Sequence, residues 1–198
     1  MLKILSKPMG LLETNCYIVY LPKGEVIVDP GMEAAEWVIQ NVKNPLAILN
    51  THGHFDHVWS NHELQIKLKT FLYTPKKDVF MLQNDPFGYG MSSSVPDFEV
   101  DGDQKYDIGG EVVEFLHFPG HTPGCSVIKI ADALFSGDFI FKNSIGRTDF
   151  PYSSPEDMKK SILKFLELKE DLKVYPGHGE STSVKAEQKN LPSWLKYL

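Results

Sequence analysis

The stretch Thr51-His52-Gly53-His54-Phe55-Asp56-His57 places three imidazoles and one carboxylate within six residues. Alternate residues of an extended backbone project to the same side, so His52, His54 and Asp56 can converge on one ion. His57 follows directly, where the chain is expected to turn into a helix, so its ring can point elsewhere. Because imidazole and carboxylate groups are the usual ligands of Zn²⁺, Fe²⁺ and Mn²⁺, the stretch predicts a metal site.

The segments on either side of this motif have the patterns of regular elements. Upstream, the apolar run 46–49 predicts a buried strand that leads directly into the motif. Downstream, residues 59–68 are expected to form a helix. Further elements are expected at residues 16–20, 25–28 and 70–73, which have the character of strands, and at residues 34–42, which have helical spacing.

Three more possible ligands occur later in the chain, each at the end of a predicted strand. His121 and His178 both follow a Pro-Gly pair, and Asp138 follows Ser-Gly. Proline and glycine fix tight turns and remove side-chain bulk, which presents one side chain rigidly. We therefore expect these three residues to join the 52–57 motif. His62 and His117, the other two histidines, are expected to lie outside the site, His62 exposed on a helix and His117 in a structural role.

The second half of the chain repeats the rhythm of the first. Its expected strands cover 112–116, 126–130, 133–136 and 173–175, and its expected helices cover 155–168 and 183–189. Strands and helices in two similar halves indicate an α/β (α+β) fold, with two sheets packed together and helices outside. At 198 residues, the chain is expected to form one domain over 1–198.

Residues 84–104 interrupt this rhythm. They have no period and are rich in Gly, Ser, Pro and aromatic residues. A long irregular loop in a compact domain is usually either a functional lid or disordered. The aromatic residues Phe87, Tyr89 and Phe98 favour a lid inserted in the domain.

Composition narrows the classes of partner. The formal net charge of −6 disfavours nucleic acid, because phosphate binding needs clustered Lys and Arg. No run of apolar residues is long enough for a membrane span or a signal peptide. The two cysteines, Cys16 and Cys125, lie in no CxxC pair and fit a reducing compartment. We therefore expect a cytoplasmic protein, whose oligomeric state the sequence leaves open.

Taken together, these motifs resemble the metallo-β-lactamase superfamily. The residues that carry the resemblance are the 52–57 motif, His121, Asp138, His178 and the turn Asp29-Pro30-Gly31, in the family's order along most of the chain. The resemblance implies a four-layer αββα sandwich with the site along one edge. It also implies an enzyme that binds two divalent metal ions, with zinc expected and iron or manganese as alternatives.

The resemblance also assigns the ligands. One metal is held by His52, His54 and His121. The second is held by Asp56, His57 and His178, and Asp138 bridges the two, so that Asp56 and Asp138 count as catalytic residues. A hydroxide shared by the two metals is then the nucleophile, and neither a serine nor a cysteine nucleophile is required.

Closer features resemble the short, single-domain members of the glyoxalase-II-like (hydroxyacylglutathione hydrolase-like) branch. They are the runs Thr51–Asn61, Pro119–Ser126 and Ser144–Pro151. This resemblance implies hydrolysis of a small thioester, such as a hydroxyacyl-glutathione-like compound. Full-length members carry a C-terminal helical region that helps to bind glutathione, whereas about twenty residues follow His178 here. Another thioester or a small ester therefore stays open as the substrate.

Three residues outside the ligand set are candidates for substrate binding. Arg147 could bind a substrate carboxylate through its guanidinium group, or it could pair with Asp149 and shape the loop. Tyr175 and Lys142 are further candidate contacts. Asp29 and Thr51 could orient ligands from outside the ligand set, and for Asp29 a purely turn-forming role is an equal alternative.

Other activities on the same fold are alternatives to hydrolysis. Persulfide dioxygenases resemble this sequence in the Gly-Arg-Thr-Asp stretch 146–149, and they use one iron ion to activate O₂. Flavodiiron oxidoreductases typically have Glu where this chain has His54. Nucleases of the superfamily add RNA-binding segments that an acidic chain of this length does not show. A metal-binding module without catalysis would be expected to lack one of the ligands.

Overall fold

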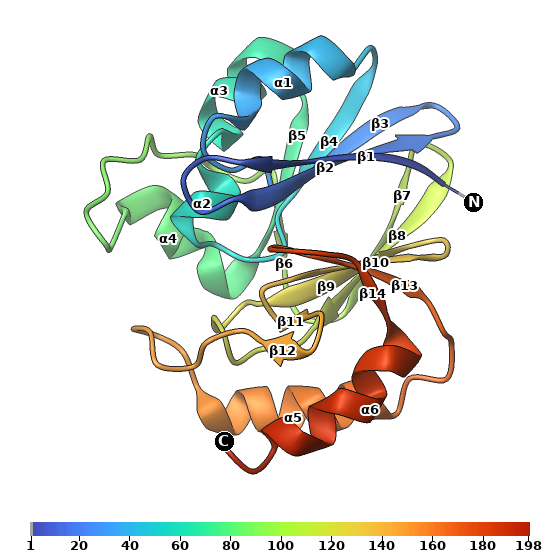
Figure 1. Cartoon of the computed structure of the whole chain (residues 1–198). Coiled ribbons are helices and arrows are strands. Elements are labelled where there is room, and N and C mark those ends of the chain that lie inside the picture. The colour runs from blue at the N-terminus through green and yellow to red at the C-terminus, as the bar shows by residue number, and fades with distance from the viewer. Residues whose placement is uncertain (1) are drawn as a thin grey trace.

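A computed structural model describes residues 2–198, in which two six-stranded sheets pack face to face with helices outside them (Figure 1). The first sheet has the strand order β1-β2-β3-β4-β5-β6, and the second has the order β14-β13-β10-β9-β8-β7. This arrangement confirms the expected αββα sandwich. No helix within residues 2–198 has both the length and the apolar character needed to cross a bilayer.

The first sheet and its helices come from the first half of the chain. Its elements are β1 (Lys3–Met9), β2 (Thr14–Leu21), β3 (Gly24–Val28), α1 (Ala34–Asn41), β4 (Pro45–Leu49), α2 (Phe55–Val58), α3 (Asn61–Leu68), β5 (Phe71–Pro75), a 3-10 turn (Lys76–Asp78), α4 (Val79–Asn84) and β6 (Phe98–Val100).

The second half supplies the other two layers. Its elements are β7 (Gln104–Ile108), β8 (Glu111–His117), β9 (Ser126–Ile130), β10 (Ala133–Gly137), β11 (Ile140–Phe141), β12 (Ser144–Ile145), α5 (Pro155–Leu166), β13 (Lys173–Pro176), β14 (Thr182–Ser183) and α6 (Val184–Trp194). Helix α5 begins as its sequence predicts, because Ser154 accepts a hydrogen bond from the Asp157 amide and Pro155 occupies the first turn.

Apolar side chains fill the three interfaces between the four layers. Between the sheets, residues such as Val19 and Val28 of the first sheet share a cluster with Phe115 and Phe135 of the second. A second cluster lies between the first sheet and α1 and α3, and a third lies between the second sheet and α5 and α6. Strands that are buried on both faces read as continuous apolar runs, which explains why 46–49 stands out in the sequence.

Parallel pairing brings the motif-bearing loops to one edge. Strand β4 runs parallel to β3 and β5, and β10 runs parallel to β13, so their carboxyl ends meet at the same side. The two sheets are joined at this edge, where the Asn15 amide donates to the Gly177 carbonyl at 2.7 Å and Thr14 forms an isolated bridge with His178.

The irregular segment is shorter than expected. Residues 98–100 form the edge strand β6, which pairs in parallel with β5 and places Phe98 opposite Tyr73. Residues 85–97 do lack regular structure except for turns, and the Asp85 carboxylate anchors them by accepting the amides of Tyr89 and Gly90. Strands β1 and β7, the short strands β11, β12 and β14, and helix α4 were not expected from the sequence.

Candidate metal centre

The structure brings all seven predicted ligands together. The nitrogen atoms of His52, His54 and His121 offer one group of donors within 4.8 Å of one another. The second group meets the same limit and consists of Asp56, His57 and His178. These are the two triplets expected from the sequence, although they come from loops that lie far apart along the chain.

Asp138 lies between the two groups. Its Oδ2 atom is 3.5 Å from Nε2 of His121 in the first group and 3.5 Å from Nε2 of His178 in the second. Its Oδ1 atom is 3.2 Å from Nε2 of His57. One carboxylate therefore faces donors of both groups, which is the placement that a bridging ligand requires.

Several polar atoms of these side chains make no hydrogen bond within the protein and are therefore available to bind cations. Four buried atoms of the ligand set have no hydrogen-bond partner in the described part of the chain: Nε2 of His52, His57 and His121, and Oδ1 of Asp138. Nε2 of His57 and Oδ1 of Asp138 lie 3.2 Å apart, but they do not form a hydrogen bond with each other. Burying a polar group without a partner is costly, so this cluster needs further ions or groups. A site built from imidazole and carboxylate donors fits divalent cations such as Zn²⁺, Fe²⁺ or Mn²⁺.

In four of the five candidate histidine ligands, the other ring nitrogen, Nδ1, has a polar partner within the protein. Nδ1 of His121 lies 2.9 Å from the Arg147 carbonyl, and Nδ1 of His178 lies 3.0 Å from the Leu12 carbonyl. A carbonyl only accepts, so each Nδ1 carries a proton and Nε2 is the nitrogen left to bind a cation. The hydrogen bonds therefore fix the tautomer as well as the orientation of each ring.

Asp29 and Thr51 orient the remaining two rings. Thr51 donates its hydroxyl to Asp29 Oδ2 at 2.6 Å, and the hydroxyl oxygen lies 3.0 Å from Nδ1 of His52. Asp29 Oδ2 also lies 2.9 Å from Nδ1 of His57, and Asp29 Oδ1 accepts the Thr51 amide. Asp29 adopts a left-handed backbone conformation with φ 49°. Because it serves three donors, its role goes beyond forming the turn.

The Pro-Gly turn before His178 allows the loops to approach closely. A Cβ atom on Gly177 would collide with Asp138 Oδ1 and would lie 2.6 Å from Cε1 of His57. Only a residue without a side chain fits there. The glycine of this turn therefore makes room for two ligands of the site.

The ionisable side chains of the site have pKa values that differ from their ordinary ones. Burial alone would raise the pKa of Asp138, but the neighbouring His57 and His178 hold it well below the ordinary value. Asp56 is likewise held at a pKa of about 2, against burial, by His57 and His178. Burial lowers the pKa of His52, His54 and His121, and that of His54 falls to about 3. Around the first group, ionised carboxylates thus lie beside three neutral imidazoles, which is the protonation state that a cation needs. In the second group, against burial, Asp56 and Asp138 raise the pKa of His57 well above its ordinary value and that of His178 to about 9, so a cation bound there would displace protons from these rings.

Asp78 is a residue of the site that sequence reasoning missed. Its carboxylate is fully buried and accepts the amides of Gly53 at 3.0 Å and Gly124 at 2.6 Å. It also accepts the Thr122 hydroxyl at 2.6 Å. These donors flank His52, His54 and His121, so Asp78 ties together the two loops that carry the first group. An isolated Asp after Lys76-Lys77 has no pattern that would have identified it.

Replacing Asp78 with Asn is expected to lower metal affinity and kcat by about 10- to 100-fold, as is typical for a group that orients ligands. The amide presents one acceptor in place of two, so at least one of the three donors loses its partner. Competition with a chromophoric chelator measures the affinity. Asp101→Asn, at an exposed carboxylate paired with Lys76, is the control. Equal affinity in both variants would contradict the assigned role.

The same residue is expected to make stability depend on pH. Burial raises the pKa of Asp78 from 3.8 to about 6, against the hydrogen bonds from Thr122, Gly124 and Gly53. Because the folded chain then binds the proton more tightly, the associated stability is present below pH 4 and is lost as the pH rises through 6. Relative to Asp78→Asn, the unmodified chain should lose roughly 3 kcal/mol of unfolding free energy over this range. Denaturant titrations of both proteins test this, and a constant difference would refute it.

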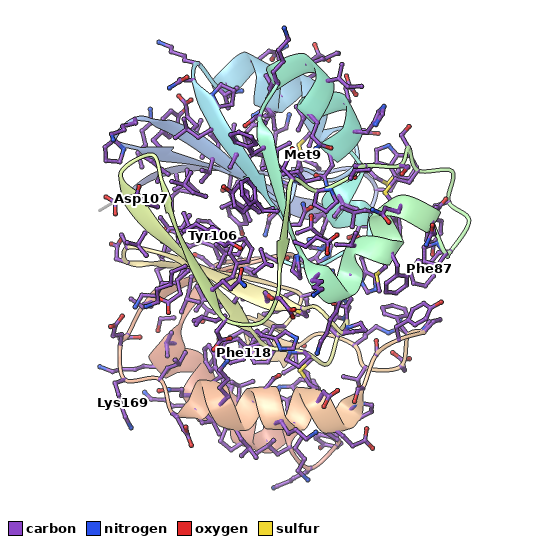
Figure 2. All side chains as sticks on the ribbon, turned by 180° about the vertical axis from the view of Figure 1, so that it is seen from behind. Met9, Phe87, Tyr106, Asp107, Phe118 and Lys169 are labelled. Carbon is purple, nitrogen blue, oxygen red and sulfur yellow. The ribbon has the colours of Figure 1, made fainter. Side chains whose placement is uncertain are left out.

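A cavity of about 440 Å³ opens onto the two groups. Five of the ligands line it: His54, Asp56, His121, Asp138 and His178. The other lining residues are mostly apolar: Leu12, Phe55, Phe87, Tyr89, Phe141, Ile145, Arg147, Phe150 and Pro151. Figure 2 shows Phe87 on the loop that follows α4.

The three candidate substrate contacts are placed differently. Arg147 lines the cavity, but its guanidinium group also forms a bidentate pair with Asp149, at 2.8 and 2.7 Å. Lys142 is outside the lining and pairs with Glu180 at 2.5 Å. Tyr175 is also outside the lining, because its ring points between the sheets and stacks on Phe135 at 5.3 Å. The structure therefore does not support Tyr175 or Lys142 as direct contacts.

The remaining two histidines lie where they were expected. His62 is exposed on α3, and Nε2 of His117 lies 2.9 Å from the Pro123 carbonyl in a local structural contact. Both cysteines are buried, and burial raises the pKa of each thiol well above its ordinary value. Neither cysteine is therefore available as a thiolate nucleophile.

The fold and the edge site define a known class of protein. The model of the metallo-beta-lactamase superfamily matches residues 9–178, and the chain belongs to this superfamily. The hydroxyacylglutathione hydrolase GloC of Haemophilus influenzae is 33% identical, over 93% of this chain and 94% of that protein.

Two solved structures extend the likeness. The B3 metallo-beta-lactamase BLEG-1 has a TM-score of 0.88 and 32% identity, over 98% of this chain and 99% of its own. TTHA1623, solved in a di-iron-bound form, has a TM-score of 0.84 and 29% identity, over 96% of this chain and 99% of its own. These similarities cover nearly the full length of each protein, and the family match over residues 9–178 spans all seven candidate ligands.

Proposed function

We propose that the chain is a metal-dependent hydrolase that cleaves a small thioester. The observation that carries the proposal is the double group of donors, with Asp138 between the groups and four buried donor atoms left without a partner. His52, His54 and His121 would hold one divalent cation, and Asp56, His57 and His178 would hold the other. When bound, such cations lower the pKa of a shared water so that hydroxide is available near neutral pH, and they polarise the substrate carbonyl.

The side chains that line the cavity support attack by water. No serine or cysteine is among the described residues that line it. Asp56 is oriented by the Thr14 hydroxyl, which donates to its Oδ2 at 2.7 Å. Asp56 and Asp138 both face the cavity as carboxylates, and each would hold a cation and help to place the attacking water. We therefore assign these two residues as catalytic.

The proton balance favours a thioester over an oxygen ester. Hydrolysis forms a carbon–oxygen bond from water, breaks the carbon–sulfur bond, and yields a carboxylic acid and a thiol. A thiol has a pKa near 8.5, so it leaves as the thiolate without a proton donor. Both carboxylates in the cavity are ionised, and a cation bound to His178 would displace its proton, so the loaded site would offer no side-chain proton to the leaving group. The name of GloC, which describes a hydrolase of hydroxyacylglutathione, agrees with this substrate class.

A metal analysis coupled to a thioester panel tests the proposal. We expect two divalent ions per chain, with zinc, iron or manganese supporting hydrolysis, and release of thiol from at least one thioester of the panel, which includes S-lactoylglutathione. One iron per chain with thiol-dependent consumption of O₂ would instead favour a persulfide dioxygenase. The cytoplasmic location and the absence of a nucleic-acid or membrane partner remain predictions.

A further inference from the structure

Aromatic side chains from two separate loops form one wall of the cavity. Phe87 comes from residues 85–97, and Phe150 comes from residues 146–153. The ring centroids of both lie 5.9 Å from that of His54. Tyr89 packs on Phe55 at 4.0 Å and extends the same wall. An apolar surface therefore begins directly beside a ligand of the first group.

The two loops contact each other and are held in place. Phe87 lies 6.2 Å from Tyr152, and Tyr152 lies 5.0 Å from Phe80 of α4. Ser153 donates its hydroxyl to the His121 carbonyl at 2.6 Å, and Asp85 anchors the start of the other loop. Because contacts within the protein already fix the wall, a ligand would lose little free energy in ordering it.

The charges around the cavity do not match a polyanionic ligand. Arg147 is the only Lys or Arg among the described residues that line the cavity. Its guanidinium group is paired with Asp149 and lies over the Phe150 ring, 4.2 Å from the centroid. Lys142 directly follows Phe141, which lines the cavity, and its ammonium group is paired with Glu180. To bring a carboxylate against a cationic side chain, a thiol with several carboxylates such as glutathione would have to break the Arg147–Asp149 pair or the Lys142–Glu180 pair.

We propose that the site selects thioesters with an apolar acyl group, a medium-length alkyl chain or an aryl group, held against the aromatic wall of Phe87 and Phe150. This inference rests on the proposed thioester hydrolysis and adds the substrate class. The carbonyl would lie at the ligands, and the acyl group would extend along the aromatic wall. The same carbon–sulfur bond is cleaved by water as above, so the inference concerns recognition and adds no chemical step.

A series of acyl thioesters of N-acetylcysteamine, which is uncharged, tests the inference on the metal-loaded enzyme. Burial of one methylene changes affinity by about fourfold at most, so kcat/KM should rise about 10- to 100-fold from acetyl to hexanoyl. The phenylacetyl thioester should match the hexanoyl thioester, and both should exceed S-lactoylglutathione. Phe87→Ala and Phe150→Ala should each reduce the rise to less than about fourfold. Phe71→Ala, which removes an exposed ring outside the cavity, is the matched control and should keep the full rise.

A binding measurement separates this inference from the proposed reaction. Non-hydrolysable thioether ketones with a short or a six-carbon apolar arm can be titrated into the metal-loaded chain by calorimetry. The longer arm should bind about tenfold or more tightly, and Phe150→Ala should remove that preference. Equal binding of both arms, or a preference for S-lactoylglutathione, would overturn the inference even if thioesters are hydrolysed. Tight binding of the long arm without any hydrolysis would support the apolar site and overturn the proposed reaction.

Discussion

Asp138→Ala will lower kcat for thioester hydrolysis by at least about a thousandfold, a loss of roughly 4 kcal/mol of transition-state stabilisation. The substitution removes the one carboxylate that faces both groups, with His121 and His178 each 3.5 Å from its Oδ2 atom. Two cations held close together repel each other, so losing the shared anion weakens both positions. Metal content should fall below two ions per chain, and kcat should fall with it. Steady-state kinetics and metal analysis on the same sample measure both effects.

Two matched variants sharpen this test. Asp138→Asn keeps the shape of the side chain but removes its charge, so it should lose nearly as much activity as the alanine variant. Asp107→Ala removes an exposed carboxylate on β7, on the side of the molecule opposite Phe87 (Figure 2), and should leave both readouts unchanged. Full activity in Asp138→Ala with two bound ions would show that this residue is not the shared ligand.

Removing the metals is the second change with a large expected effect. A chelator should abolish hydrolysis, and it should also lower the melting temperature. A ligand present at about a thousand times its Kd stabilises the folded state by about 4 kcal/mol, which corresponds to roughly 8–16 °C for a chain of this size. Activity and thermal unfolding of stripped and reloaded samples measure the two effects together.

The histidines provide the controls for metal removal. In His54→Ala the first group loses a ligand, so added metal should restore neither the full melting temperature nor hydrolysis. In His62→Ala an exposed ring on α3 is removed, and both properties should respond to metal as in the unmodified chain. A stripped sample that keeps full activity would refute a metal-dependent reaction.

Much of the candidate site could be predicted because its candidate ligands lie in loops at the ends of buried strands. The run 46–49 is apolar on both faces, so its end is recognisable and the following motif is placed with it. Which face a side chain takes in such a strand is harder to predict. Tyr175 is half-buried in β13 and lies between two buried neighbours, Val174 and Pro176, so the sequence does not show that its ring points between the sheets.

The unpredicted elements have a common physical origin. Strands β1 and β7 lie at sheet edges, where one side faces solvent and charged residues interrupt the apolar pattern. Strand β6 has three residues, which is too few for a period to appear. Asp78 was missed because its partners are backbone amides and a hydroxyl of distant loops, and such contacts exist only after the chain has folded.

The order of the ligands along the chain has a consequence for biosynthesis. His178 lies near the end of the 198 residues, and it is held to the first hairpin through the Leu12 carbonyl and the bridge to Thr14. A nascent polypeptide that ends before β13 can present His52, His54 and His121, but its second triplet stays incomplete. The second triplet can thus form only after the ribosome has made residue 178, so a translation product interrupted before this point cannot present the complete set of candidate ligands.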